Sequence, residues 1–291
     1  MRILASLLAL LMCSVSIAAQ QKLAFDIASI RENKSGTGPG SDEPNTNVPL
    51  GPGNVYSPTG GQLNLRNIEF LQLVSFAWKL TLPQRDAFHD MAPPWAREAR
   101  YDIKARTDKA NVTKDELRLM MQSLLQERFG LTVHYEDRTS SVYSLQLLKP
   151  DTLGPHFRKH TGPCSTEFAG NTTVDAGADG YPKVCGGLLL LSGSSGTHFR
   201  IGASDMPIAV FATSLTGWGD LGRPVVNDTG ITGNIDFVLD FIPPSPQAAA
   251  VDQEGQGFQE ALHKQLGMKL EAQKQPVPIL VLDHIDHLSE N

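Results

Sequence analysis

Apolar positions along the chain follow two different periods, and their order predicts a mixed fold of strands and helices. The stretch AFDIASIREN (24–33) is a short apolar-rich run of the kind that forms a strand. In QLNLRN (62–67), Leu63 and Leu65 alternate with polar residues, and this period of two predicts another strand. The residues that follow, IEFLQLVSFAWKL (68–80), instead place apolar side chains at helical spacing. The chain is therefore expected to be α+β, with an N-terminal strand ahead of a strand–helix unit.

The same succession of patterns occurs a second time further along the chain. The strand and helix at 62–80 are repeated by RIGASD (200–205) and MPIAVFATSLTGW (206–218). Three further pairs of segments follow in the same order: YDIKART (101–107) with IDFVLDF (235–241), MQSLLQERFGLTVH (121–134) with FQEALHKQLGMKLE (258–271), and SVYSLQLL (141–148) with PVPILVLD (276–283). Gly130 and Gly267 fall where each second helix must end, in the left-handed position that glycine tolerates best. We predict an internal duplication that forms two similar lobes. Each has the order strand, helix, strand, helix, strand, strand, and the last two strands form a hairpin.

Regions rich in Gly, Pro, Ser and Asn separate these units. The segment 34–61 is dense in such residues, which predicts a long exposed loop. We divide the chain into a signal peptide (1–19), an N-terminal strand and loop (20–61), a first α+β repeat (62–150), a loop region (151–199) and a second α+β repeat (200–291).

The first residues have the pattern of a cleavable signal peptide. Arg2 is followed by a mostly apolar run to Val15 and then by small residues, and that run is too short to cross a bilayer. A lipid anchor at Cys13 is not expected, because Met12 replaces the usual small residue and the apolar run continues past the cysteine. No later stretch resembles a membrane helix, so we expect a secreted or periplasmic protein with no transmembrane segment in the mature chain. The formal charge of −6 disfavours nucleic acid as a partner.

Removal of the signal peptide leaves two cysteines, Cys164 and Cys185. In an exported protein such a pair predicts a disulfide, which would stabilise the fold by about 3 kcal/mol for a loop of this length. The alternative is a thiol metal site. The absence of a CxxC motif and of a third cysteine in the mature chain favours the disulfide.

The most conspicuous motif, LGRPVVNDTGITGNIDFVLDF (221–241), has an explanation in backbone geometry. Asp228 and Gly230 are typical of a tight turn, and Gly233 marks a second turn before the next strand. We predict structural turn roles for these residues and for Arg223, which could pair with Asp228. An anion-binding nest of backbone N–H groups is the functional alternative.

Other motifs offer no coherent catalytic set. SGSSG (192–196) lacks the first glycine of a nucleophile elbow, DHIDH (283–287) places its histidines on opposite faces of a strand, and HFRKH (156–160) is expected in a loop. Asp102 and Asp236 are equivalent in the two repeats, which suggests that each caps an adjacent turn. Trp95 either fills the space beneath a Pro-rich loop or offers a stacking surface. We assign no catalytic residue, no cofactor and no metal from the sequence.

Several stretches together resemble a known family. They are FDIASIREN, PPWAREARYDIKART, LMMQSLLQERFGLTVHYEDR, LGRPVVNDTGITGNIDFVLDF and the segment from Ala261 to Asn291. They are similar to the "soil-associated" family of exported acidobacterial proteins, which is built on a domain of unknown function, and the resemblance extends over residues 24–291. The Cys164 and Cys185–Gly186–Gly187 arrangement also resembles that family. Fusions of the same domain to antibiotic-sensor-type membrane metallopeptidases imply a sensing or binding role outside the cytoplasm.

Export, duplication and the lack of a catalytic set favour a non-catalytic binding module of the cell envelope. Paired lobes form grooves, and such grooves are frequent ligand sites. The ligand or partner protein and the oligomeric state are not fixed by the sequence. The alternative is an exported hydrolase that acts on envelope or environmental polymers. That function requires a cleft in which a histidine approaches a serine or an aspartate.

Overall fold

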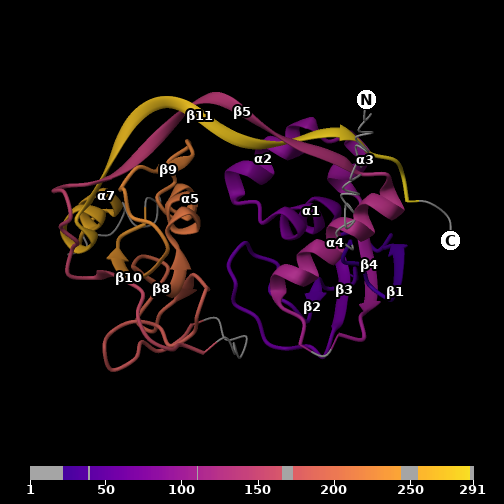
Figure 1. The fold of residues 1–291 in the computed structure, drawn as a ribbon, viewed down its shortest axis with the longest axis horizontal. Coiled ribbons are helices and arrows are strands. Elements are labelled where there is room, and N and C mark those ends of the chain that lie inside the picture. The colour runs from indigo at the N-terminus through magenta and orange to yellow at the C-terminus, as the bar shows by residue number, and fades with distance from the viewer. Residues whose placement is uncertain (1–21, 39, 110, 166–172, 244–254, 289–291) are drawn as a thin grey trace, which may run out of the picture.

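The computed structural model describes residues 22–38, 40–109, 111–165, 173–243 and 255–288, which form two lobes joined by a long β-ribbon (Figure 1). The predicted signal peptide and Cys13 lie outside the described residues. Among the helices that the structure describes, none is both long and apolar enough to cross a membrane. The predicted α+β class is confirmed.

The first lobe is an antiparallel sheet covered by helices. Its strands, in the spatial order β1-β4-β3-β2, are β1 (Ile27–Glu32), β4 (Arg100–Arg106), β3 (Gln62–Glu69) and β2 (Asn45–Thr46). The helices are α1 (Phe70–Trp78), α2 (Leu82–Met91), α3 (Pro94–Glu98) and α4 (Lys114–Phe129). Leu63 and Leu65 are buried, as the alternation in β3 predicts. Phe70 and Phe129 meet edge to face in the core, with ring centroids 5.0 Å apart.

The second lobe has the same plan in smaller form. Its sheet has the order β6-β10-β8-β7, formed by β6 (Phe157–Lys159), β10 (Asn234–Phe241), β8 (Phe199–Pro207) and β7 (Leu189–Leu190). Its helices are α5 (Ile208–Trp218) and α7 (Phe258–Ala261), and α7 continues into the π-helical turn η1 (Leu262–Leu266). Phe211 packs on Phe237 with ring centroids 4.6 Å apart, and both side chains are fully buried.

The sheets of the two lobes and the helices that pack on them correspond, although α2 and α3 have no counterpart in the described part of the second lobe. The spatial order β1-β4-β3-β2 maps onto β6-β10-β8-β7, and in each lobe a helix follows directly from the first strand of the predicted repeat, α1 from β3 and α5 from β8. Gly130 and Gly267 both end helices in the left-handed conformation, at φ 57° and 71°. This arrangement agrees with an internal duplication, which itself stays a prediction.

The predicted hairpin at the end of each repeat is wrong. Residues 132–147 form one continuous strand, β5 (Thr132–Leu147), and residues 268–284 form another, β11 (Met268–His284). The two strands pair with each other in antiparallel register, from Met268 opposite Leu147 to His284 opposite Thr132. Residues 132–147 contain neither glycine nor proline, so nothing in β5 favours the tight turn that a hairpin needs.

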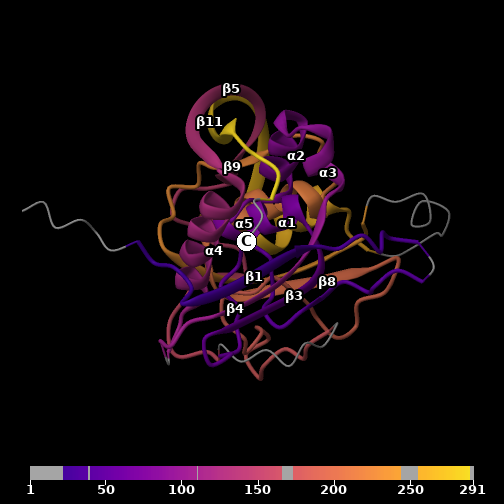
Figure 2. The same cartoon turned by 90° about the vertical axis from the view of Figure 1, so that its right-hand side faces the viewer.

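The ribbon of β5 and β11 exchanges strands between the lobes. β5 leaves the first lobe after α4, and its Leu145 is buried in the core of the second lobe. β11 runs in the opposite direction from the second lobe, and its Leu280 is buried in the core of the first lobe. Figures 1 and 2 show the ribbon arching over the helices, on the side opposite the sheets. The short strand β9 (Val225–Asn227) pairs in parallel with Tyr143–Leu145 of β5 and extends this sheet to three strands. Isolated two-stranded ribbons are marginal in water, so the buried ends in both lobes stabilise this one.

The division of the chain at residues 61, 150 and 199 stays a prediction. β1, from the predicted N-terminal segment, pairs with β4 over its whole length. β6 and β7, from the predicted loop region, are the edge strands of the second sheet. β1 is itself a predicted strand, whereas β2, β6 and β7 lie in segments predicted to be loops, so such segments contribute strands to both sheets.

Candidate functional site

A cavity of about 510 Å³ lies between the two lobes. The first lobe contributes residues 49–55, α1, α2 and the start of α4, and the second contributes Gly187, Leu188 and α5. At Gly217 of α5 an added Cβ would lie only 3.2 Å from Leu82 Cδ1 of α2, so the two helices approach closely beside the cavity. The groove predicted between the lobes therefore corresponds to a partly open space with walls from both.

The cavity surface is mainly apolar, because its helical hydroxyls bond to their own helices. Ser75 donates to Leu71 O at 2.7 Å, Thr213 to Ala209 O at 3.0 Å and Ser214 to Phe211 O at 2.7 Å. The charged side chains in the wall are Arg85 and Lys114. The wall contains no His, Asp, Glu or Cys among the residues described. A space of this kind suits a ligand with an apolar body and few polar groups.

Lys114 is a buried cation at the first turn of α4. Its side chain is 4% exposed, and Nζ donates to Gly51 O at 3.2 Å and to Gly53 O at 2.7 Å. Burial, together with the nearby positive charge of Arg118, lowers the pKa of Lys114 to about 7, although Asp115 acts in the opposite direction. Lys114 is therefore close to its protonation midpoint at neutral pH.

Arg118, one turn further along α4, holds the same loop. It is 2% exposed, and its Nη2 donates to the carbonyl oxygens of Gly51, Pro52 and Gly53 at 2.7–3.1 Å. Its Nη1 donates to Asn54 Oδ1 at 3.2 Å. These two cations therefore fix the carbonyls of residues 51–53, which form one wall of the cavity.

The same loop contacts the second lobe directly. The backbone N–H groups of Asn54 and Val55 donate to Gly186 O at 2.7 and 3.3 Å. A Cβ at Gly53 would lie 2.4 Å from Gly186 O, and Gly186 itself has a φ of 67°, so both positions require glycine. This contact is a second connection between the lobes, in addition to the ribbon. It begins one residue after Cys185.

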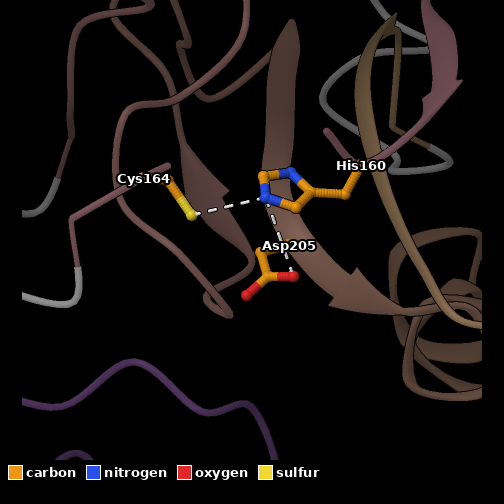
Figure 3. Close-up of side chains that lie close together, drawn as sticks. All are labelled: His160, Cys164 and Asp205. Carbon is orange, nitrogen blue, oxygen red and sulfur yellow. Dashed lines mark hydrogen bonds and ion pairs between the residues drawn. The ribbon is translucent and has the colours of Figure 1, made fainter. Parts of the chain in front are cut away.

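The predicted disulfide between Cys164 and Cys185 is present, with a Cα–Cα distance of 5.3 Å. It lies against the side chain of His160, which follows β6. Figure 3 shows one ring nitrogen of His160 between Cys164 and Asp205. That nitrogen, Nε2, is 3.9 Å from Cys164 Sγ and 3.8 Å from Asp205 Oδ1.

Asp236 of β10 orients this histidine. The carboxylate is 1% exposed, and its Oδ1 lies 2.6 Å from His160 Nδ1 and accepts from the Asp205 N–H at 3.0 Å. Its Oδ2 accepts from Arg158 Nε at 2.7 Å. The guanidinium of Arg158 also bonds to Asp179 and stacks over the ring of Tyr181 at 3.9 Å. Asp236 thus fixes His160 with its Nε2 turned toward the disulfide.

In the first lobe, Asp102 likewise accepts a hydrogen bond from a backbone N–H group. Its Oδ1 accepts from the Asn67 N–H at 2.9 Å and from Asn33 Nδ2 at 2.9 Å. Asn67 and Asp205 both have left-handed backbones, at φ 52° and 53°. The two equivalent aspartates therefore cap equivalent bends, as their placement in the repeats suggests.

The predicted turn residues connect the second lobe to the ribbon. Gly230 and Gly233 have φ angles of 74° and 83°, as tight turns require. In place of the predicted ion pair, Asp228 accepts from Ser144 Oγ of β5 at 2.5 Å, and Arg223 lies over the ring of Tyr143.

The other candidate histidines do not converge. His134 pairs with Asp283 at 2.8 Å, His284 pairs with Asp286 at 2.9 Å, and His287 stacks on Trp95 with ring centroids 4.2 Å apart. The residues 157–159, expected in a loop, form β6 instead, because they pair with Ile235–Phe237 at the sheet edge. Within the described part of the chain, the group whose spacing suits a metal is His160, Cys164 and Asp205.

Sequence reasoning missed both Asp205 and the buried cations of α4. His160 and Asp205 are brought together by β6 and β8, which lie on either side of β10, and no local motif links them. For α4 a signal does exist. Thr113 and Glu116 form a capping box, in which Thr113 Oγ1 accepts from the Glu116 N–H at 3.2 Å, and this T-x-x-E pattern marks the start of the helix.

A family model described as "Protein of unknown function (DUF3738)" matches residues 71–285, which include most of both lobes and the ribbon. No curated protein and no solved structure matches the chain. Because the match extends over more than half of its length, the chain belongs to the DUF3738 family of proteins of unknown function.

Proposed function

We propose that this protein is a non-catalytic binding module of the cell envelope that holds a small amphipathic molecule between its lobes. The observation that carries the proposal is the cavity of about 510 Å³, which has walls from both lobes and is mainly apolar. The ligand would place its apolar body against α1, α2 and α5. An acidic or hydrogen-bond-accepting group would lie toward Arg85 or Lys114.

The cavity favours binding over catalysis because the hydroxyls on α1 and α5 and the amine of Lys114 all donate to backbone carbonyls. Acyl transfer needs a nucleophile beside a base, and the described lining residues include no His, Cys, Asp or Glu. The His–Asp pairs among the described residues, His89–Asp90, His134–Asp283, His160–Asp236 and His284–Asp286, lie outside the cavity. The alternative of an exported hydrolase would need one of these pairs to serve a separate cleft.

Three observations support a location outside the cytoplasm. The pattern of residues 1–19 is that of a signal peptide, and Cys164 and Cys185 form a disulfide of the kind that persists in oxidising compartments. The resemblance to the soil-associated family of exported proteins supports the same location. Its metallopeptidase fusions favour ligand sensing or binding as the role.

The proposal is tested by filling the cavity. Val210 of α5 lines the cavity, whereas Ala209, its neighbour on the same helix, is exposed and does not. Binding of a fatty-acid series and of anilinonaphthalene sulfonate to the full chain would be measured by fluorescence and thermal shift. We expect Val210→Trp to weaken binding by at least tenfold and Ala209→Trp to leave it unchanged.

Two results would contradict the proposal. One is that probe binding is equal in the two variants, which would place the bound molecule elsewhere. The other is turnover of ester, glycoside or peptide substrates by the wild-type chain, with loss of that turnover on removal of a His–Asp pair.

A further inference from the structure

We propose that reduction of the Cys164–Cys185 disulfide by a dithiol converts this corner of the second lobe into a four-ligand Zn²⁺ site. The ligands are His160 Nε2, Cys164 Sγ, Cys185 Sγ and Asp205 Oδ1. Structural zinc sites in proteins are tetrahedral and use these donor types. The proposal concerns a part of the molecule outside the cavity lining and does not depend on the proposed binding function.

Three of the four donor atoms, those of His160, Cys164 and Asp205, are already spaced for one metal ion. Two donors of a tetrahedral zinc site lie about 3.4–3.6 Å apart, given usual Zn–N, Zn–O and Zn–S bond lengths. His160 Nε2 lies 3.9 Å from Cys164 Sγ and 3.8 Å from Asp205 Oδ1. Figure 3 shows that both contacts are made by the same ring nitrogen, so the imidazole faces the point where an ion would sit. Shifts of a few tenths of an ångström complete this part of the coordination.

The orientation of His160 is already that of a metal ligand. A ligating histidine usually bonds to a carboxylate or a carbonyl through its other nitrogen, which fixes the tautomer and the ring plane. Asp236 has this position, 2.6 Å from Nδ1, and is itself held by Arg158 and by the Asp205 N–H. The arrangement leaves Nε2 as the nitrogen available to an ion.

The backbone keeps the two cysteines close without the S–S bond. The Cys185 N–H donates to Ser165 O at 2.6 Å, and the Ser165 N–H donates to Lys183 O at 2.8 Å. Cys185 also forms a β-bridge with Ser204, the residue before Asp205. These bonds connect the backbone beside Cys164, Cys185 and Asp205, so cleavage of the disulfide leaves the two cysteines adjacent. Cys164 Sγ already lies beside His160, and Cys185 Sγ reaches the ion by rotation about its Cα–Cβ bond.

The chemistry balances with a dithiol as the reductant. Its two thiols become a disulfide and supply the two electrons and two protons that convert the Cys164–Cys185 bond into two thiols. Zn²⁺ then displaces both protons to solvent and binds the two thiolates, the neutral imidazole and the carboxylate. Disulfide and zinc are thus alternative cross-links at the same place. In both states the cross-link restrains Cys185 and the adjoining Gly186, which accepts the hydrogen bonds from the first lobe.

The test measures metal binding by the full chain in two redox states. Zn²⁺ affinity is determined by competition with a chromophoric chelator, and Co²⁺ is used as a spectroscopic substitute that reports thiolate ligation. We expect the reduced chain to bind one equivalent of Zn²⁺, to gain thermal stability from it and to show a thiolate-to-Co²⁺ absorption band. The oxidised chain should bind at least ~100-fold more weakly, because a disulfide sulfur is not a thiolate ligand.

Variants identify the other ligands. His160→Ala and Asp205→Asn should each weaken binding to the reduced chain, and Asp236→Asn should weaken it by about 10–100-fold, as loss of a carboxylate behind a ligating histidine does. His156→Ala, at the opposite end of β6, is the matched control and should bind Zn²⁺ like the wild type. Circular dichroism of each reduced variant distinguishes loss of the site from loss of the fold.

Three outcomes would overturn the proposal. The first is a reduced wild-type chain that binds no Zn²⁺, and the second is equal binding by the oxidised and reduced chains. The third is a reduced His160→Ala variant with wild-type affinity and an unchanged Co²⁺ spectrum, because the cysteines alone would then account for the metal.

Discussion

The two lobes share a backbone plan but bury opposite charges. In the described part of the first lobe, the buried side chains of Asp, Glu, Lys and Arg are Lys114 and Arg118. In the described part of the second lobe, the buried one is Asp236. The cations of the first lobe bond mainly to backbone carbonyls of residues 51–53, whereas the anion of the second bonds to Arg158 and His160. A charge held by carbonyls serves to shape a loop. A carboxylate that bonds to an imidazole also fixes the orientation of that imidazole, which leaves its other nitrogen free to bind a ligand.

The equivalent aspartates make this contrast specific. Asp102 and Asp236 each accept a backbone N–H from a residue in the left-handed conformation. The second partner differs. A neutral amide, that of Asn33, bonds to Asp102, and two basic side chains bond to Asp236. Asp102, with a neutral amide as its partner, therefore only caps a bend. Asp236, with basic partners at the edge of its sheet, caps a bend and also orients His160.

The largest expected effect is that of removing the buried carboxylate. Asp236→Ala removes the buried acceptor of three hydrogen bonds, from Arg158, His160 and the Asp205 N–H, although Arg158 keeps its bond to Asp179. It should lower the free energy of unfolding by about 2–4 kcal/mol, as the loss of hydrogen bonds to a buried charged group does. Asp102→Ala removes bonds to neutral groups at a half-buried position and should cost about 1–2 kcal/mol. Urea unfolding of both variants measures the difference. Equal costs would mean that the basic partners of Asp236 add no stability.

Lys114, a buried cation of the first lobe, should make the free energy of unfolding depend on pH. Because burial lowers the pKa of Lys114 to about 7, the folded chain binds fewer protons here than the unfolded chain between pH 7 and the ordinary lysine pKa. The free energy of unfolding should therefore rise with pH across this window, by no more than about 5 kcal/mol at 1.4 kcal/mol per pKa unit. The penalty is fully present below pH 7, where both states are protonated.

Lys114→Met isolates this contribution. The variant removes the titrating group and keeps the apolar stem, so its stability should change less between pH 7 and pH 10 than that of the wild type. Lys264→Met in the second lobe is the control, since Lys264 is exposed and pairs with Glu260 on the surface. A wild-type slope retained in Lys114→Met would assign the pH dependence to another group.

The equivalent helix ends differ in their surroundings. At Gly267 an added Cβ would lie 2.8 Å from the backbone nitrogen of Gly154, whereas at Gly130 it would meet the flexible carboxylate of Asp286 at 2.7 Å. Both positions have positive φ, which costs a side chain about 1–2 kcal/mol. Gly130→Ala should cost about that much, and Gly267→Ala about 1–3 kcal/mol more because backbone atoms cannot move aside. Thermal unfolding of the two variants gives the comparison.

The sequence predicted the parts of the fold that local patterns determine. The alternation at Leu63 and Leu65, the helix at 68–80 and the left-handed Gly130 and Gly267 depend on residues close together, and the structure agrees with each. The hairpins failed because β5 finds its partner in β11, more than 120 residues away, and no local signal reports such a pairing. The same limit applies to the site. The pairing of Cys164 with Cys185 follows from counting cysteines. The approach of His160 to Asp205 and Asp236 depends on the order of strands in the sheet.

The smallest expected effect tests the neutral partner of Asp102. Burial raises the pKa of Asp102, but hydrogen bonds from Asn33 and from the Asn67 N–H outweigh it and hold this pKa below its ordinary value. A carboxyl group with a lowered pKa stabilises the folded state above its unfolded pKa of about 3.9, and this stabilisation is lost as the pH falls through the folded pKa. Asn33→Ala should cost about 1 kcal/mol at pH 7, the value of one hydrogen bond to a charged group at a half-exposed site. The difference from wild type should vanish in acid, where Asp102 is protonated in both chains. If the difference instead persists at low pH, Asn33 stabilises the lobe through its bond to Asp42, and the contrast with His160 rests on Asp236 alone.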